Sequence, residues 1–221
     1  MTLQALVFDL DGTLVDTAPD LHAATNYVLA LIDRRPVSAA EVRSFVGHGA
    51  MNLIERGVNA TGAPVDQETL HRLHKQFLIY YGDNIADHSV LFEGIPALLD
   101  QAQSKGLKMG VCTNKVESLS RKLLIEIGVM DKFMALVGGD TLPIMKPNPE
   151  PYFETVKRLG IDPSCSLMFG DSETDIRTAQ AAGVPVIAVT FGYTTQHVRN
   201  FGPTHMIDHY DEAWPLISTY L

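Results

Sequence analysis

The sequence predicts an α/β fold: a Rossmann-like parallel sheet with helices on both faces, and a small helical cap inserted after the first strand. Three observations predict it. A buried-strand pattern opens the chain, strand and helix patterns alternate from residue 95 onward, and the stretch between them has only helical spacing. We therefore expect a core domain formed by residues 1–15 and 88–221, with residues 16–87 as the inserted cap domain.

The first half of the chain is expected to contribute one strand and then helices alone. Leu3–Phe8 is short and apolar, as in a buried strand. After Asp16, apolar residues recur three and four positions apart, which is the spacing of one helix face. Gly47 and Gly49 interrupt this pattern between two short helical pieces. The expected helical segments are 21–31, 42–46, 51–56 and 70–80.

The second half of the chain alternates between strands and helices. Three of its helical patterns stop at Gly106, Gly128 and Gly160, and glycine is the residue that helices favour just beyond their last turn. Strands that alternate with helical patterns of about ten residues favour a parallel sheet. The expected helices are 95–102, 119–127, 152–159 and 174–182, and the expected strands are 107–111, 133–137, 165–169, 184–190 and 204–207.

Composition narrows the class of protein. The net charge of −9 argues against a nucleic-acid or anionic membrane partner, although a bound cation would still allow a small anionic substrate. Cys112 and Cys165 lack zinc-site spacing, which favours a reduced compartment, and we expect a cytoplasmic protein. The chain shows neither a signal-peptide pattern nor an apolar run long enough to cross a membrane. Its oligomeric state is open between monomer and homodimer.

Polar residues follow four of the expected strands. In an open parallel sheet the carboxyl ends of the strands meet at one edge, where ligands collect. Each residue has an ordinary alternative, because Asp is common in turns and a lone Thr or Lys is common at strand ends and on surfaces. Several acids together repel one another unless a cation is bound, and oxygen ligands suit Mg²⁺. The residues at this edge are Asp9, Asp11, Gly12, Thr113, Asn114, Lys115, Lys146, Asp171 and Asp175.

The order and spacing of these residues resemble the haloacid dehalogenase superfamily of phosphohydrolases, over essentially the whole chain. The segment Asp9-Leu10-Asp11-Gly12-Thr13 matches the DxDGT motif of that superfamily, and Val111-Cys112-Thr113-Asn114 matches its apolar strand that ends in Ser or Thr. Lys146-Pro147 matches its lysine motif, and the segment from Gly170 to Asp175 matches GDxxxD. The helical insertion after the first motif looks like the small cap of this superfamily.

The resemblance implies a role for each motif residue. Asp9 would attack phosphorus and form an aspartyl phosphate, and Asp11 would protonate the leaving oxygen and then deprotonate the hydrolytic water. Thr113 would donate a hydrogen bond to a phosphoryl oxygen. Lys146 would neutralise Asp9 and the phosphoryl charge. Gly12 allows the sharp turn that such a pair of carboxylates requires.

The resemblance also implies Mg²⁺ as cofactor. Asp9 and Asp171 would bind it directly, and Asp11 through its backbone carbonyl. Asp175 belongs to the same acidic set and is expected to act through water or through Lys146. The alternative for Asp175 is a first-turn acid that complements the helix dipole.

The substrate is expected to be chosen largely by the cap. Asp11 argues against the dehalogenase branch, and the lack of a lysine between Val37 and Glu68 argues against the phosphonatase reaction. The opening DLDGTLVDTAPDL looks most like the phosphoglycolate phosphatases, and so do Val46–Gly49, Thr113–Lys115 and Val189–Tyr193. The favoured substrate is therefore 2-phosphoglycolate.

The candidate substrate-binding residues are Gly47, His48, Arg43, Asn114 and Lys115. Gly47 flanks a turn that could reach the active site, where His48 and Arg43 would meet the carboxylate of a small acid phosphate. The alternatives are a loop histidine with local partners and a solvated helix arginine. Asn114 and Lys115 are expected at the substrate entrance, with loop caps as their alternative.

The expected function is thus a Mg²⁺-dependent phosphatase of small phosphate monoesters. Alternatives of the same class are a phosphatase for another metabolite, such as a sugar phosphate, and a phosphosugar mutase, which shares all four motifs. An alternative of another class is a phosphoacceptor signalling module, which also surrounds an aspartate with acids, a hydroxyl and a lysine. Such modules lack a second acid two residues after the nucleophile and a cap inserted after the first strand.

Overall fold

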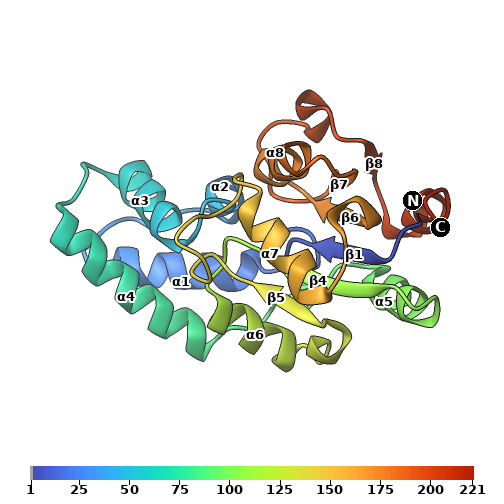
Figure 1. Cartoon of the computed structure of the whole chain (residues 1–221). Coiled ribbons are helices and arrows are strands. Elements are labelled where there is room, and N and C mark those ends of the chain that lie inside the picture. Colours follow the sequence, from blue (N-terminus) through green and yellow to red (C-terminus); the bar gives the residue numbers. More distant parts are fainter. Residues whose placement is uncertain (1) are drawn as a thin grey trace.

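The structure is a computed structural model that describes residues 2–221. Within these residues a six-stranded, wholly parallel sheet has the strand order β5-β4-β1-β6-β7-β8 (Figure 1). Its strands are β1 (Ala5–Phe8), β4 (Lys108–Cys112), β5 (Ala135–Val137), β6 (Ser166–Gly170), β7 (Val186–Val189) and β8 (His205–Ile207). The predicted α/β fold with a parallel sheet is confirmed.

Helices cover both faces of the sheet because the strands are apolar on both. Leu6 and Phe8 join one buried cluster with residues of α5 and α6, while Ala5 and Val7 join another with residues of α7 and α8. Successive strand residues point to opposite faces, so an unbroken apolar run serves two helical layers. The helices are α5 (Ile95–Ser104), α6 (Glu117–Glu126), α7 (Glu150–Leu159), α8 (Glu173–Ala182) and a short α9 (Ala213–Ser218), which the sequence reading missed.

Strand β1 lies in the middle of the sheet and marks the point where the chain changes direction. From β1 the chain passes to β4 and β5 on one side, and it then returns to β6, β7 and β8 on the other side. In doubly wound sheets the crevice for a ligand lies beyond the carboxyl end of the strands at such a switch point. The loop that follows Phe8 is therefore placed at the position where this topology puts a site.

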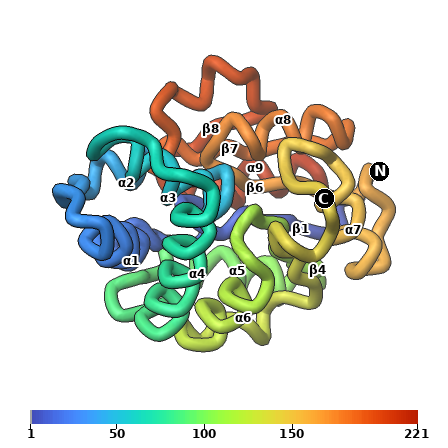
Figure 2. The backbone as a smooth tube through the Cα atoms, turned by 90° about the vertical axis from the view of Figure 1, so that its left-hand side faces the viewer, coloured from blue at the N-terminus to red at the C-terminus, as the bar shows by residue number. Residues whose placement is uncertain are grey.

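Four helices lie between β1 and α5 in the sequence and pack on one another. Figure 2 views them from their own side, in front of the sheet. They are α1 (Ala18–Ala30), α2 (Ala39–Phe45), α3 (Ala50–Thr61) and α4 (Gln67–Asp83). Helix α3 continues through Gly57 and is longer than expected. A Cβ at Gly57 would lie 3.3 Å from Thr25 of α1, so this glycine lets α1 and α3 approach closely. We call these four helices the cap; its division from the core at residues 16 and 87 stays a prediction.

A two-stranded antiparallel ribbon joins the cap to the sheet. It pairs β2 (Val15–Asp16) with β3 (Val90–Leu91), and strands of two residues have too little periodicity to be read from the sequence. The buried carboxylate of Asp20 accepts hydrogen bonds from the backbone N–H groups of His88 and Ser89 and from the Ser89 hydroxyl. This carboxylate therefore ties the two connecting segments together.

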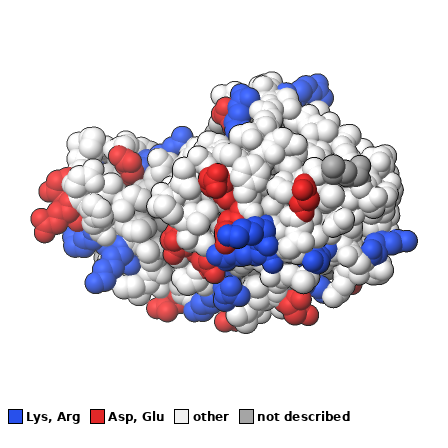
Figure 3. Space-filling view, in the orientation of Figure 1, with Lys and Arg blue, Asp and Glu red and all other residues white. Residues whose placement is uncertain are grey.

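The surface carries charges of both signs. On the face shown in Figure 3, acidic and basic side chains are interspersed. Among residues 2–221, no helix combines the length and the apolar character required to cross a membrane.

Candidate active site

A cavity of about 70 Å³ lies between the carboxyl edge of the sheet and the cap. At about 15 Å³ for each water, it has room for roughly five water molecules, which suits a small ligand. Its core side is polar and its cap side is largely apolar. The core contributes Asp9, Asp11, Thr113, Asn114, Lys115, Lys146, Asp171, Ser172, Asp175, Tyr193 and Thr194 with the apolar Val116 and Leu119, and the cap contributes Leu21, Val46, Gly47, Gly49, Ala50, Leu53, Phe77, Leu78 and Tyr81.

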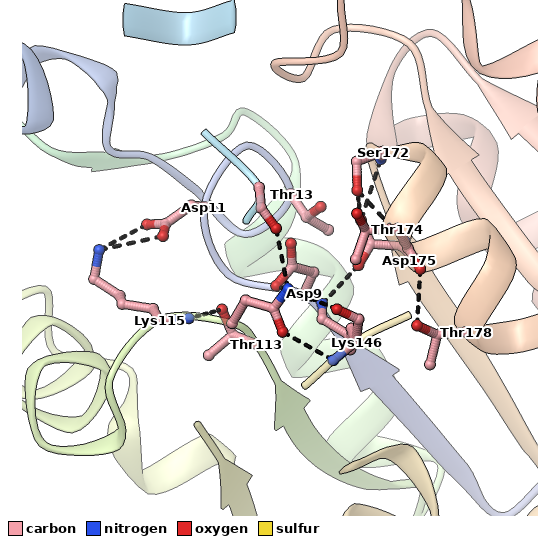
Figure 4. Close-up of polar contacts among 12 residues, drawn as sticks. Asp9, Asp11, Thr13, Thr113, Lys115, Lys146, Ser172, Thr174, Asp175 and Thr178 are labelled. Carbon is pink, nitrogen blue, oxygen red and sulfur yellow. Dashed lines mark hydrogen bonds and ion pairs between the residues drawn. The ribbon is translucent and has the colours of Figure 1, made fainter. Parts of the chain in front are cut away.

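Lys146 joins two buried carboxylates at the edge of the sheet. Its Nζ lies 2.9 Å from Oδ1 of Asp9, directly after β1, and 2.6 Å from Oδ1 of Asp175 in α8 (Figure 4). Burial alone would lower the pKa of Lys146, but the charges of Asp175 and Asp9 outweigh burial and hold that pKa above its usual range. Lys146 is therefore a fixed positive charge beside Asp9.

Asp171 is held by donors from two other loops. The Thr13 hydroxyl donates to its Oδ1 at 3.1 Å, and the backbone N–H of Tyr193 donates to its Oδ2 at 2.7 Å. Gly192 allows this approach, because a Cβ there would collide with the Asp171 side chain. These contacts leave part of the Asp171 carboxylate free to bind a further group, since a carboxylate can accept about four hydrogen bonds.

Asp175 is occupied on both oxygens. Oδ1 receives Lys146, and Oδ2 receives the Ser172 hydroxyl at 2.6 Å together with the N–H groups of Ser172 and Asp171 at 3.1 and 3.3 Å. Ser172 is the N-cap of α8, so Asp175 completes a capping box as well as orienting Lys146. Four donors use nearly all of its accepting capacity, which favours a supporting role for Asp175 over direct metal binding.

The acidic cluster fits a divalent cation. Oxygens of Asp9, Asp171 and Asp175 lie within 4.8 Å of one another, and all three carboxylates are buried. If ionised, three carboxylates and one ammonium leave two negative charges, which one Mg²⁺ would balance. All the candidate ligand atoms are carboxylate oxygens, the ligand type that Mg²⁺ prefers.

The pKa values of Asp9 and Asp171 also favour a cation site. Burial, and then the charge of Asp175, raise the pKa of Asp9 to about 6, although Lys146 opposes the shift. Burial and the charges of Asp175 and Asp9 raise the pKa of Asp171 well above its usual range. Lys146 thus offsets only part of the cost of ionising the two buried carboxylates, and a bound cation would lower it further, as expected of a cation site.

Asp11 points away from Asp9 and towards the cap. Its carboxylate accepts hydrogen bonds from Lys115 Nζ at 2.9 and 3.2 Å and from the Thr17 hydroxyl at 2.7 Å (Figure 4). Lys115 also donates to the hydroxyl of Tyr81, in α4 of the cap, at 2.8 Å. The two carboxylates of the first motif thus have different surroundings: one lies in the acidic cluster and the other in an ion pair beside the cap.

Thr113 and Asn114 occupy the same edge. The Thr113 hydroxyl accepts the backbone N–H of Lys115 at 3.2 Å, which leaves its own proton free to donate. The Asn114 side chain exchanges hydrogen bonds with the backbone of Lys146, and it donates to the carbonyl of Gly47 in the cap at 3.0 Å. Asn114 therefore fixes the lysine loop and links it to the cap.

Two of the candidate cap residues lie outside the cavity lining, whereas Gly47 is part of it. Arg43 forms an ion pair with Asp16 at 2.9 Å and lies over the ring of Tyr193 at 5.2 Å. The side chain of His48 is exposed to solvent. The structure therefore gives Arg43 a contact at the base of the cap, and the substrate-binding roles of Arg43 and His48 stay predictions.

The sequence reading missed two tyrosines of the site. It placed Tyr80 on the apolar face of its helix, but the structure buries Tyr81 and stacks the half-buried Tyr80 on Tyr27. Positions three and four after Phe77 both fit a helix face, so only packing decides between them. The second tyrosine is Tyr193, whose hydroxyl donates to Asp16 at 2.6 Å and whose contact with Asp171 is made by the backbone, which leaves no sequence signal.

Comparisons with known proteins agree on the type of molecule. The profile of the haloacid dehalogenase-like hydrolase family matches residues 6–189. A phosphoglycolate phosphatase of Mesorhizobium japonicum is 44% identical over 211 residues, or 96% of this chain and 93% of that protein. One from Caulobacter vibrioides is 43% identical over 197 residues, or 89% and 83% of the two chains. The crystal structure of a predicted phosphoglycolate phosphatase from Haemophilus somnus 129PT superposes with a TM-score of 0.93, at 28% identity and 98% coverage of both chains.

Proposed function

Because the chain belongs to the haloacid dehalogenase-like hydrolase family, we propose that it is a Mg²⁺-dependent phosphatase of small phosphate monoesters that prefers 2-phosphoglycolate. The observation that carries the proposal is the buried Asp9 carboxylate. It lies within one acidic cluster with Asp171, and its Oδ1 lies 2.9 Å from the ammonium of Lys146. A buried carboxylate at the cavity, held beside a lysine that can also neutralise phosphoryl charge, is suited to attack phosphorus.

In the first half of the reaction, Asp9 attacks the phosphorus atom and the ester oxygen leaves. The P–O bond to the alcohol breaks as the bond to the Asp9 carboxylate forms, and Asp11 gives its proton to the departing oxygen. Lys146 neutralises charge on the phosphoryl oxygens, and the free hydroxyl proton of Thr113 donates to one of them. Mg²⁺, held by Asp9, Asp171 and the Asp11 carbonyl, would supply charge neutralisation and in-line orientation.

In the second half, water replaces Asp9 on phosphorus. Asp11, now ionised, removes a proton from the attacking water, and the bond between phosphorus and the Asp9 oxygen breaks to release inorganic phosphate. Asp175 keeps Lys146 and the start of α8 in place through both steps. The apolar cap residues over the cavity limit the entry of other water during the first half.

The preference for 2-phosphoglycolate has two supports. Relatives of this name cover nearly the whole chain at 44% and 43% identity, and the cavity is small. Gly47, Asn114 and Lys115 line the cavity where the glycolate part would lie, and we propose that they bind it. Arg43 and His48 would contribute only if the cap moved relative to the arrangement seen here.

The test is phosphate release from a panel of phosphate monoesters, with pyrophosphate as an anhydride for comparison, in Mg²⁺ and in EDTA. The panel contains 2-phosphoglycolate, glucose 6-phosphate, AMP and pyrophosphate, and β-glucose 1-phosphate is checked for isomerisation. We expect the highest kcat/KM with 2-phosphoglycolate, loss of activity in EDTA and recovery on adding Mg²⁺. Activity that ignores EDTA would remove the metal from the mechanism. A stable phosphoprotein without steady phosphate release would instead favour the signalling-module alternative.

A further inference from the structure

The cavity offers a substrate only two cationic side chains among its described lining residues, Lys115 and Lys146. Lys146 is already engaged by Asp9 and Asp175, at 2.9 and 2.6 Å. It lies beside the position that the phosphoryl group must occupy for attack by Asp9. Any second anionic group of the substrate therefore has Lys115 as its available counter-charge within this lining.

Lys115 is held in place from both sides of the cavity. Its side chain is only 6% exposed, and its Nζ donates to Asp11 on the core side and to the Tyr81 hydroxyl on the cap side, at 2.9 and 2.8 Å. The Tyr81 ring lies 4.4 Å from the same Nζ, a distance at which the ring face attracts a cation. The ammonium thus points into the space between Asp11 and α4.

Asp11 does not depend on Lys115 alone. The Thr17 hydroxyl donates to Asp11 Oδ1 at 2.7 Å, so the carboxylate keeps a partner if Lys115 turns to another anion. While Asp11 remains paired with Lys115, however, it points away from Asp9 and from the phosphoryl position (Figure 4). The ion pair seen here is therefore a resting arrangement of the proton-transfer group.

We propose that Lys115 selects the substrate by exchanging partners: an anionic group of the substrate replaces Asp11 at Lys115, and the freed Asp11 takes up a proton from solvent and turns to face the ester oxygen. The inference rests on the proposed phosphatase function. A substrate without this anion would bind more weakly and would also leave Asp11 in its resting pair. The preference for a substrate with this anion then appears in kcat as well as in KM, because proton transfer by Asp11 depends on the exchange.

The surroundings of Lys115 define the class of substrate. The Lys115 ammonium contacts Asp11, the group that must reach the ester oxygen, so an anion that replaces Asp11 there lies only a few bonds from the phosphate. The cap side of the cavity is lined mainly by apolar side chains such as Leu21, Leu53 and Phe77, and its one hydroxyl among the described lining residues, that of Tyr81, already accepts from Lys115, so few partners remain for the hydroxyls of a sugar. The chemistry is that of a short, doubly anionic phosphate monoester, a description that 2-phosphoglycolate fits.

The binding test uses two non-hydrolysable phosphonates in Mg²⁺, measured by calorimetry. 3-Phosphonopropionate carries a carboxylate at the substrate position, and propylphosphonate has the same chain without the charge. We expect wild-type protein to prefer the first by about 100-fold, the typical effect of a desolvated charge pair, and Lys115→Met to lose that preference. Lys115→Arg should keep part of the preference for 3-phosphonopropionate. Lys75→Met, which removes an exposed lysine of α4, is the matched control and should keep all of it.

The kinetic test compares 2-phosphoglycolate with ethyl phosphate. Wild-type protein should show the lower kcat, as well as the higher KM, with ethyl phosphate. Tyr81→Phe, which keeps the ring and removes one acceptor of Lys115, should reduce the preference by a smaller factor and serves if Lys115→Met does not fold. Equal binding of both phosphonates, or a difference confined to KM, would overturn the exchange. Absence of hydrolysis of every ester would refute the proposed function itself, whereas hydrolysis with an unchanged ratio in Lys115→Met refutes only this inference.

Discussion

The two sides of the cavity differ in both chemistry and attachment. On the core side, Asp9, Lys146 and Asp171 lie at strand ends or in the loops that follow them, and Asp175 lies in the first turn of α8; their contacts are buried ion pairs and hydrogen bonds. On the cap side, the lining is mainly apolar, and its polar links to the core are few. Those at the cavity are the Asn114 side chain on the Gly47 carbonyl and Lys115 on the Tyr81 hydroxyl.

The difference indicates that the core side and the cap side of the cavity have separate functions. Charged groups that must keep fixed distances are placed by the sheet, whose strands cannot shift without breaking their backbone hydrogen bonds. The part that must admit and release a ligand is joined by the β2–β3 ribbon and by a small number of side-chain contacts. Substitutions on the core side should therefore affect chemistry, whereas those on the cap side should affect binding and closure.

The largest effect is expected for Asp9→Asn. The amide keeps the shape of the side chain but cannot act as the nucleophile, so kcat should fall by at least about 10⁴-fold. Removing one of several clustered acids should leave the melting temperature unchanged or raise it. Asp131→Asn, at an exposed position outside the cavity, is the control. Substantial residual turnover, measured as phosphate release after removal of any wild-type contaminant, would show that Asp9 is not the nucleophile.

Metal removal should change both activity and the pH dependence of stability. Because burial raises the pKa of Asp9 to about 6, the folded metal-free protein retains a proton that the unfolded chain, with a pKa near 4, has lost. The free energy of unfolding contributed by Asp9 should therefore decrease as pH rises from about 4 to 6. Saturating Mg²⁺ should reverse this decrease, because it binds the ionised carboxylate.

Thermal unfolding between pH 4.5 and 7, with and without Mg²⁺, measures this effect. Asp171→Asn should weaken Mg²⁺ binding by at least about 100-fold in calorimetry, since effects of 10–100-fold are typical even of residues that only orient a ligand. It should also reduce the stabilisation by Mg²⁺. A Mg²⁺-independent melting curve in the wild-type protein would contradict the cation site.

A smaller effect is expected where the cap meets the core. Asn114→Ala removes the hydrogen bond to Gly47 and those to the Lys146 backbone, at a cost of about 1–3 kcal/mol. Asn114→Asp keeps the acceptor for the Lys146 N–H but loses both donated bonds. Comparing the two variants therefore separates the effect of the bond from the Lys146 N–H from that of the two donated bonds. We expect KM to rise in both variants and kcat to fall mainly in Asn114→Ala. Identical kinetics in the two would show that the bond from the Lys146 N–H contributes nothing to the effect.

The smallest effects are expected at the base and rim of the cap. Arg43→Met breaks a partly exposed ion pair with Asp16, and such pairs contribute about 0–1 kcal/mol to stability. His48→Ala removes an exposed side chain. We expect kcat/KM for 2-phosphoglycolate to change by less than about fivefold in each, which corresponds to about 1 kcal/mol. A loss of 100-fold would instead show that the residue reaches the substrate and that the cap closes further over it.

The core elements were readable from the sequence because they follow local rules. Strands β4 and β6 and the glycine-terminated helices lie within one or two residues of their expected positions. The motif residues Asp9, Thr113, Lys146 and Asp171 all line one cavity, as their positions after parallel strands predicted. The ribbon of β2 and β3 and helix α9 were missed, since segments this short carry too little periodicity.

The sequence by itself determined the parallel sheet and the residue types at its edge, because strand periodicity and loop position are local properties of the chain. Only the tertiary structure decided which carboxylate meets which cation. Asp11 and Lys115 are 104 positions apart, and Tyr81 reaches Lys115 from an inserted helix, so no local pattern links them. The same packing sets Arg43 against Asp16 instead of the cavity, because the side chains that surround a helix residue depend on how the cap sits on the core.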